Sequence, residues 1–297
     1  MRANLFIVGA AKSGTTSLAS YLGQHQDIFV PIIKEPKYFS LHENIFPHCG
    51  PGDTVVDSNV VKTASEYKKL YIGAENQIYR VDASVDYLFC EGAAARIWKY
   101  NNKARIIIIL RNPVDRAYSA YMHMVRDGRE VLSFEDALNK EGERAENNWE
   151  FFWRYRECGM YYQQVKRYYK YFPSSQINVV TFDELARNAD MLIDRIMSFL
   201  EIGRAYEIDT SRRLNESGIP KNRLLHTLFN KDNSIKSIIK RIIPAVIRNA
   251  IKDKVTENNL SKQTMPLISR KYLEGYYDED VILLEKLLRG KLHWHKN

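Results

Sequence analysis

Cysteine is scarce in this chain of 297 residues, which contains only Cys49, Cys90 and Cys158. Three widely spaced thiols form neither a disulfide framework nor a CxxC metal clip, and this pattern is typical of a reducing compartment. Long apolar runs are also missing. No stretch reaches the ~18 residues that a membrane-spanning helix requires, and the run Leu5–Val8 is too short for a signal peptide. We therefore expect a cytoplasmic protein.

Acidic residues are outnumbered by basic ones, with 36 Asp and Glu against 44 Lys and Arg, so the formal net charge is +8. This excess favours anionic ligands such as nucleotides, acidic glycans, nucleic acid or lipid headgroups, without choosing among them. Hydrophobic residues make up 45% of the chain, which is enough for a buried core, and no internal repeat or linker divides it. We therefore predict one domain over residues 1–297, with a helical C-terminal part from about residue 221.

Short apolar runs alternate with segments of helical periodicity. The runs Leu5–Val8, Arg105–Leu110 and Ile177–Phe182 predict strands, and the second is apolar throughout after its first residue. Apolar residues recur at helical spacing over residues 15–25, and Pro113 suits the first turn of a helix that follows the second strand. This alternation predicts an α/β fold with a mainly parallel sheet.

Further helices are predicted in the second half of the chain. Their ranges are Ser133–Asn139, Trp149–Phe172, Met191–Leu200 and Asp278–Leu288, the last with Asp278 as its cap. The second of these ranges is dense in aromatic residues. Such a stripe more often packs into a core than forms a platform on which a sugar stacks, and both alternatives are open at this point.

A loop containing glycine follows the first predicted strand and reads GAAKSGTTS over residues 9–17. Between a strand and a helix, the backbone N–H groups and the helix N-terminus can bind a phosphate. In the GxxxxGK[ST] loop of nucleoside triphosphatases the lysine follows the last glycine, whereas Lys12 precedes Gly14 in this chain. The loop therefore indicates a phosphate site of another kind. Thr15 or Thr16 would also suit the N-cap of the helix.

The segment KSGTTSL (12–18) resembles the 5′-phosphosulfate loop of sulfotransferases that use 3′-phosphoadenosine 5′-phosphosulfate (PAPS). The likeness is nearest to the branch of heparan-sulfate and bacterial carbohydrate sulfotransferases. KEPKYF (34–39), ASVDYL (83–88), RNPVDRAYSAY (111–121) and LLRGKLHW (287–294) resemble further motifs of that family, in the same order. The resemblance implies a P-loop-like three-layer sandwich with helices on both faces of the sheet. It also implies PAPS as sulfuryl donor, adenosine 3′,5′-bisphosphate (PAP) as product, and no metal.

The resemblance also assigns roles to individual residues. Lys12 would stabilise the charge that grows on the bridging oxygen, and Glu35 would take the proton from an acceptor hydroxyl or amine. Arg111 follows a buried strand and Ser119 lies two turns into the next helix, so that both could reach a 3′-phosphate. The nucleotide-binding residues would be Lys12, Ser13, Gly14, Thr15, Thr16, Ser17, Arg111, Ser119, Lys221 and Arg223. The acceptor-binding residues would be Lys34, Lys37 and Ser84, although the two lysines could equally be ordinary surface residues.

The acceptor is predicted to be a glycan or another hydroxyl-bearing compound. Residues 82–85 read DASV where family members often carry EKTP or EASP, so the lysine that some glycosaminoglycan enzymes use there is missing. The basic, apolar-rich segment 231–254 could rest on an anionic membrane, or it could pack beside the acceptor cleft.

Two other functions fit part of the pattern. A P-loop nucleotide kinase would explain the glycine loop, but the position of Lys12 argues against it. A nucleic-acid-binding module would explain the positive charge, but no recognition motif accompanies it, so we expect no nucleic-acid partner.

Overall fold

A five-stranded parallel sheet forms the centre of the protein in the computed structural model, which describes residues 1–203, 208–211, 219–220, 260–261, 263–290, 292 and 294. The strands are β1 (Leu5–Ile7), β2 (Ile28–Phe29), β3 (Tyr79–Asp82), β4 (Arg105–Leu110) and β5 (Ile177–Thr181). Their order across the sheet is β2-β3-β1-β4-β5, and every neighbouring pair is parallel. A separate antiparallel pair joins β6 (Ile219–Pro220) to β7 (Leu260–Ser261).

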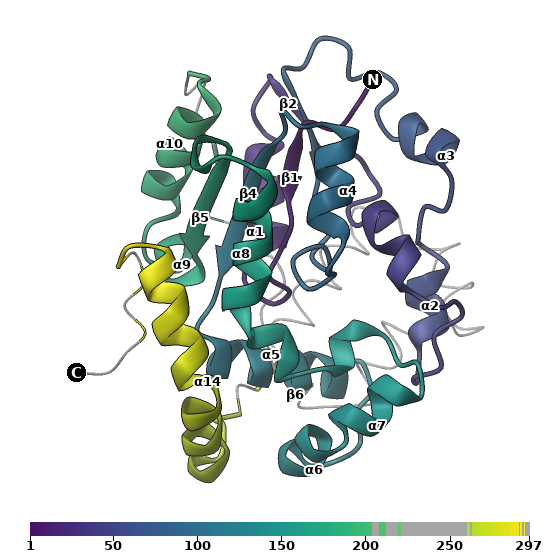
Figure 1. The fold of residues 1–297 in the computed structure, drawn as a ribbon, viewed down its shortest axis with the longest axis vertical. Helices are drawn as coiled ribbons and strands as arrows, with labels where there is room; N and C mark the ends of the chain where they lie inside the picture. The colour runs from purple at the N-terminus through teal and green to yellow at the C-terminus, as the bar shows by residue number, and fades with distance from the viewer. Residues whose placement is uncertain are drawn as a thin grey trace, which may run out of the picture.

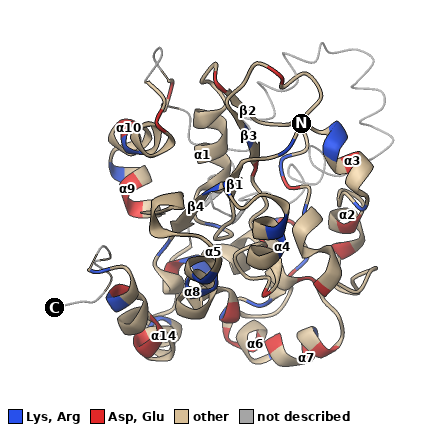
Figure 2. Ribbon diagram, turned by 45° about the horizontal axis from the view of Figure 1, so that its top comes forward, with Lys and Arg blue, Asp and Glu red and all other residues tan. Residues whose placement is uncertain are grey.

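Helices cover both faces of the sheet (Figure 1). The α-helices are α1 (Thr15–Leu22), α2 (Asp53–Asp57), α3 (Ala64–Lys69), α4 (Ala93–Tyr100), α5 (Pro113–Arg126), α6 (Phe134–Asn139), α7 (Glu141–Glu146), α8 (Tyr161–Tyr171), α9 (Phe182–Arg187), α10 (Ala189–Leu200) and α14 (Leu267–Leu287). Short 3₁₀ helices are η1 (Tyr38–Glu43), η2 (Phe151–Trp153), η3 (Glu157–Gly159) and η4 (Ser174–Gln176). Acidic and basic residues both occur on outer helices such as α9 and α14 (Figure 2).

The alternation of side chains along each strand produces two cores, one on each face of the sheet. Leu5 and Ile7 of β1 pack with α1 and α10, whereas Phe6 between them packs with α4, α8 and α14. The same alternation holds in β4, where Ile107 faces the first core and Ile108 the second. The predicted three-layer α/β sandwich is thus confirmed, and the central sheet is entirely parallel.

The predicted helix over Trp149–Phe172 is wrong in its first half. Residues 151–153 and 157–159 form the two 3₁₀ turns η2 and η3, and only Tyr161–Tyr171 form an α-helix. Gly159 lies in η3, and a Cβ atom there would lie 2.7 Å from the Tyr277 hydroxyl oxygen. The Tyr277 side chain of α14 thus approaches the backbone closely at this point.

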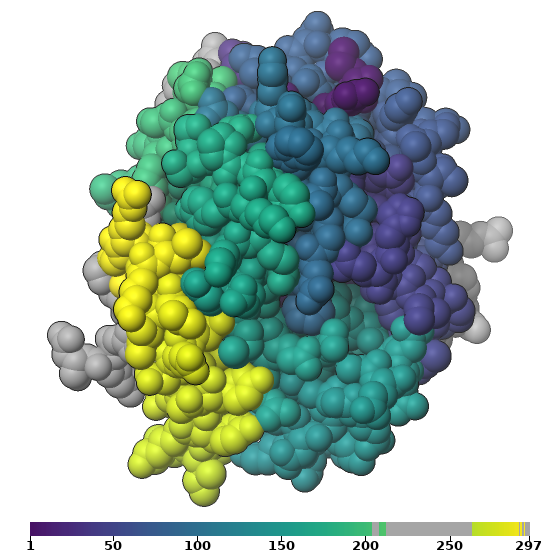
Figure 3. Space-filling model, viewed as in Figure 1, coloured from purple at the N-terminus to yellow at the C-terminus, as the bar shows by residue number. Residues whose placement is uncertain are grey.

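The last described helix, α14, begins at Leu267 and not at Asp278 as predicted. Asp278 therefore lies inside the helix and does not cap it. A nearby carboxylate caps another helix: Asp280 accepts hydrogen bonds from the Tyr161 N–H at 2.7 Å and the Tyr162 N–H at 3.1 Å. These two amides belong to the first turn of α8, whose N-cap residue Met160 offers no side-chain acceptor. In Figure 3, α14 lies directly against the surface formed by the middle of the chain.

The substitution Asp280→Ala is expected to destabilise the protein by about 1 to 2 kcal/mol, because it removes the only side-chain acceptor described at the N-terminus of α8. Urea unfolding followed by circular dichroism measures the change. Glu279→Ala is the matched control, since Glu279 is the exposed neighbour on the same helix. Equal losses of stability in the two variants would contradict the capping role.

Candidate active site

A cavity of about 1180 Å³ lies where the parallel strands end. Lys12 follows β1, Val85 follows β3, Arg111 follows β4 and Phe182 follows β5, and all four line its wall. Ligands bind at the carboxyl ends of strands in open α/β sheets, because loops there bring residues from several strands together. This cavity is therefore the candidate active site.

The loop between β1 and α1 supplies one wall of the cavity. Gly14 has a φ of 89° and precedes the first turn of α1, so Gly14 is the N-cap and neither threonine is. A Cβ atom on Gly14 would lie 2.8 Å from a methyl carbon of Leu185, and the positive φ would strain any larger residue at this position. Gly14 and residues 15–17 all line the cavity, whereas Ser13 is fully buried behind them. The positive end of α1 thus faces the cavity.

Lys12 extends from this loop to the cavity wall. Burial, together with the positive charges of Arg126 and Arg111, lowers the pKa of Lys12 to about 7. No carboxylate forms an ion pair with Lys12 among the residues that the structure describes. An anion that enters the cavity would therefore favour the charged ammonium form of this residue.

Arg111 brings a second cation to the same cavity. Its guanidinium donates a hydrogen bond to the Lys12 carbonyl oxygen at 3.2 Å and lies 4.5 Å from the centre of the Phe182 ring. Burial lowers the pKa of Arg111, although the side chain stays charged because arginine titrates far above neutral pH. Ser119 lines the cavity from α5, the helix that Asn112 caps directly after β4. The predicted pair Arg111 and Ser119 is therefore brought to one wall.

Glu35 lines the cavity together with its neighbour Lys34. The Glu35 side chain keeps 33% of its surface exposed, and its Oε1 lies 3.7 Å from the Lys34 ammonium. The Lys34 ammonium also contacts the Thr16 hydroxyl. This contact ties the segment that carries Glu35 to the phosphate loop, and burial lowers the pKa of Lys34. The phosphate loop and the segment that carries Glu35 thus line the same cavity.

Lys37 is paired inside the protein. Its ammonium lies 2.9 Å from Glu150 Oε1 and 5.3 Å from the centre of the Phe151 ring. Burial opposes the charge, but the carboxylates of Glu150, Asp86 and Glu35 outweigh it and raise the pKa of Lys37 above its usual range. Lys37 is therefore a fixed cation with an internal partner.

Ser84 lies beneath the cavity and does not line it. The side chain is fully buried, accepts a hydrogen bond from the Lys37 N–H at 3.0 Å and donates one to Asp82 at 2.7 Å. Burial raises the pKa of Asp82 to about 7, while hydroxyl groups of Tyr67 and Tyr87 also donate to its carboxylate. The structure thus places Ser84 where it positions the backbone at Lys37, in contrast to the acceptor contact predicted from the sequence.

Several cavity residues were not predicted. Among them are His123, Arg129, Phe151, Phe152 and Phe182. Burial and the charge of Lys12 lower the pKa of His123 to about 3, so its imidazole is neutral at neutral pH. The spacing from Ser119 to His123 is one helical turn and could have indicated it. Of the aromatic stripe, Trp153, Tyr161 and Tyr168 are core residues, whereas the first two phenylalanines face the cavity.

Lys221, Arg223 and the basic segment 231–254 lie outside the described residues. Within the described part of the chain, no three His, Cys, Asp or Glu side chains gather as metal ligands would. Among the helices that the structure describes, none combines the length and apolar character needed to cross a bilayer.

The chain is similar to known proteins in sequence and in fold. The family model of the sulfotransferase domain matches residues 2–217. A crystal structure of a sulfotransferase from Alicyclobacillus acidocaldarius is 34% identical, with a TM-score of 0.81 and coverage of 100% of both chains. Heparan sulfate glucosamine 3-O-sulfotransferase 5 from Mus musculus is 25% identical over 204 residues, which are 66% of this chain and 52% of the relative.

Membrane-associated sulfotransferase kil1 from Dictyostelium discoideum is 20% identical over 280 residues, with coverage of 67% of this chain and 56% of the relative. The chain thus spans about half the length of the curated relatives it matches. The family match extends over most of the chain, and the bacterial structure covers all of it. The resemblance seen in the sequence is confirmed, and this protein belongs to the sulfotransferase family.

Proposed function

We propose that this protein transfers a sulfuryl group from PAPS to a hydroxyl or amine of an acceptor and releases PAP. One observation carries the proposal: Lys12 and Arg111 are both without a carboxylate partner among the described residues, and they line the same cavity as Glu35. PAPS carries phosphate groups at two positions of one adenosine. Two separate cations on one cavity wall suit such a ligand, since each can neutralise one end.

In this proposal the acceptor oxygen attacks sulfur while the bond from sulfur to the bridging phosphate oxygen breaks. Lys12 and the N-terminal turn of α1 stabilise the charge that moves onto the 5′-phosphate. Arg111 and Ser119 hold the 3′-phosphate, and the phosphate loop orients the sulfate in line with the acceptor. Glu35 takes the proton that the acceptor loses. These roles are supported by the position of each side chain on the cavity wall.

The acceptor proposed from family likeness is a glycan or another hydroxyl-bearing compound. Support comes from relatives such as heparan sulfate glucosamine 3-O-sulfotransferase 5, which the chain matches over 66% of its length. We also propose a single domain and a cytoplasmic location. The single domain is supported by Leu284 and Leu288, which complete the core that contains Phe6 near the other end of the chain. Contact of segment 231–254 with a membrane remains a prediction.

Glu35→Gln tests the proposed base. The variant keeps the size of the side chain but cannot accept a proton, so turnover should fall at least ~100-fold. Transfer of labelled sulfate from PAPS measures this loss. Titration calorimetry with PAP serves as the control and should give nearly unchanged affinity. Normal turnover in this variant would rule Glu35 out as the base.

Arg111→Ala tests the 3′-phosphate site. Loss of a charged hydrogen-bonding partner should weaken PAP binding about 10- to 100-fold. Binding of adenosine 5′-phosphosulfate should change far less, because that nucleotide has no 3′-phosphate. Calorimetry on both nucleotides gives the comparison. Equal losses would show that Arg111 acts elsewhere, and tight binding of ATP with Mg²⁺ would favour a kinase instead.

The affinity for PAP should depend on pH through Lys12, whose pKa is about 7 in the free site. The bound phosphate favours the ammonium form and raises this pKa, so binding takes up a proton above neutral pH. Affinity from this residue is complete below about pH 7 and falls by up to about tenfold per pH unit above it. Lys12→Arg should lose this dependence, since arginine stays charged. Parallel pH profiles for the two proteins between about pH 6 and pH 9 would contradict the assignment.

A further inference from the structure

The wall of the cavity around Glu35 differs in character from the wall around Arg111. We define the Glu35 side by seven lining residues: Lys34, Glu35, Lys37, Val85, Arg129, Phe151 and Phe152. Val85 follows β3, whereas Phe182 beside Arg111 follows β5, and these strands lie on opposite sides of β1 and β4 in the sheet. The Glu35 side is thus the region left for the acceptor once a nucleotide occupies the other.

Every cation of the Glu35 side has a carboxylate partner. Lys34 lies 3.7 Å from Glu35, and Lys37 lies 2.9 Å from Glu150. Arg129 contacts Asp53, whose carboxylate is fully buried. Lys12 and Arg111 have no such partner among the residues that the structure describes. The protein therefore presents charge for an anion at one end of the cavity and a neutralised surface at the other.

The neutralised surface is built from aromatic rings. Phe151 and Phe152 are half-buried and both line the cavity. The Phe151 ring stacks on Phe89 at 6.0 Å between ring centres, and the Phe152 ring lies 5.3 Å from the imidazole of His123. The Phe151 and Phe152 rings meet edge to face, with 5.8 Å between their centres and an angle of 79° between their planes, so they form an apolar corner in the cavity wall.

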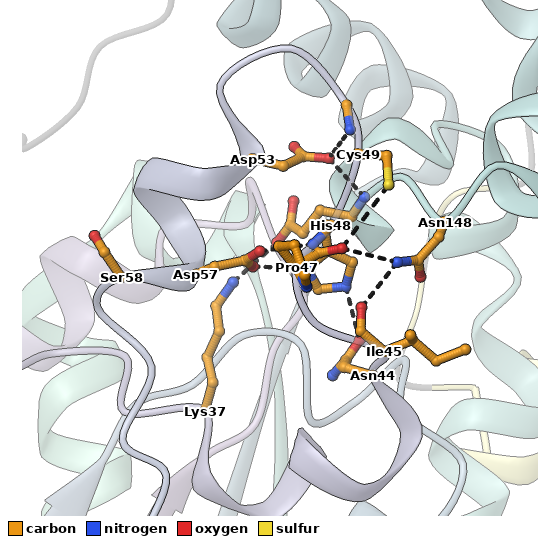
Figure 4. A network of polar contacts seen from close by, with 12 residues as sticks. Lys37, Asn44, Ile45, Pro47, His48, Cys49, Asp53, Asp57, Ser58 and Asn148 are labelled. Atoms are coloured by element: carbon orange, nitrogen blue, oxygen red, sulfur yellow. Dashed lines mark hydrogen bonds and ion pairs between the residues drawn. The ribbon is translucent and has the colours of Figure 1, made fainter.

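Buried polar contacts fix the frame that carries these rings. Asp53 accepts hydrogen bonds from the Glu150 N–H at 3.0 Å and from the Trp153 indole at 2.9 Å, which joins α2 to η2. In the same network the His48 imidazole lies 2.6 Å from Asp57 (Figure 4). These contacts link the segment that carries Phe151 and Phe152 to α2 through buried hydrogen bonds.

We infer that the Glu35 side of the cavity selects an uncharged acceptor with a ring, whose apolar face packs into the corner between Phe151 and Phe152, and that it does not select a polyanionic glycan. The inference rests on the proposed function. A polyanion gains affinity from cations that are free to pair with it, and here it would have to compete with Glu35, Glu150 and Asp53. A neutral sugar ring and a phenol both offer a flat apolar face beside a hydroxyl group.

Transfer of labelled sulfate from saturating PAPS to three acceptors tests the inference: a neutral gluco-oligosaccharide, 4-nitrophenol and heparan sulfate. We expect kcat/KM for at least one neutral acceptor to exceed that for heparan sulfate by about tenfold or more. The neutral acceptor with the higher kcat/KM shows whether the site prefers a sugar or a phenol. A preference for heparan sulfate, or no transfer to either neutral acceptor by a protein that binds PAP, would overturn the inference and leave the nucleotide site intact. Absence of PAP binding would instead overturn the proposed function itself.

Two variants test the residues directly. Phe152→Ala should raise KM for the neutral acceptor about tenfold with KM for PAPS unchanged, and Phe152→Tyr should restore it. Phe182→Ala is the matched control on the nucleotide side and should raise KM for PAPS instead. Glu150→Gln removes the carboxylate that forms the ion pair with Lys37, so transfer to heparan sulfate should increase several-fold. Unchanged acceptor KM in Phe152→Ala, or no gain with Glu150→Gln, would argue against the assignment.

Discussion

The positive charge held by Lys12 and Arg111 without a carboxylate partner is the constraint on which this active site depends. Burying a cation is unfavourable unless something compensates for the lost water. Asp127 acts on Lys12, and Asp115 and Asp183 act on Arg111, but burial outweighs them and lowers the pKa of both cations. The Lys12 carbonyl accepts a hydrogen bond from Arg111, and the Phe182 ring lies beneath that guanidinium. These contacts orient the two cations but do not neutralise them. A bound anionic ligand would supply the negative charge that pairs with these two cations.

The rest of the cavity follows the opposite rule. Lys37 pairs with Glu150, the N-cap residue of η2, and Arg129 pairs with Asp53 of α2. Lys34 pairs with its neighbour Glu35. Such pairs contribute little net stability, since desolvation offsets most of the attraction. Their effect is to fix geometry: the Lys37–Glu150 pair sits beside the Phe151 ring, and Ser84 and Asp82 support the same backbone from below. One cavity thus combines two cations that form no ion pair among the described residues with a second region whose cations are paired with carboxylates.

The sequence could predict the parts of the fold whose local signal agrees with their surroundings. Arg105–Leu110 was predicted to the residue, because a continuous β-branched run suits a strand buried on both faces. Strand β3 was not predicted, since Arg80 and Asp82 interrupt its apolar pattern. The buried Asp82 carboxylate is accommodated by hydroxyl groups of Tyr67, Ser84 and Tyr87, and the strand pattern does not reveal these contacts. The start of α14 was missed for a similar reason. Its partner surfaces lie on α5 and α8, and no local pattern reports them.

The site was predictable where residues follow one another along the chain, as in the loop around Lys12 and the unit of Arg111 and Ser119. Pairings between distant segments were not, and the ion pairs of Lys37 and Arg129 are of this kind. Phe151 and Phe152 lie in a stripe that looks uniform in sequence, yet only the 3₁₀ turn η2 directs them away from the core occupied by Trp153.

The contribution of α14 to the central core has a consequence for biosynthesis. During translation the N-terminal strands leave the ribosome long before residues 267–288. The face of the sheet that carries Phe6 can therefore be covered by α4 and α8 first, and Leu284 and Leu288 complete this core last. Sheets with uncovered apolar faces associate readily with one another and with chaperones. We therefore expect the core that contains Phe6 to be completed only after α14 has left the ribosome.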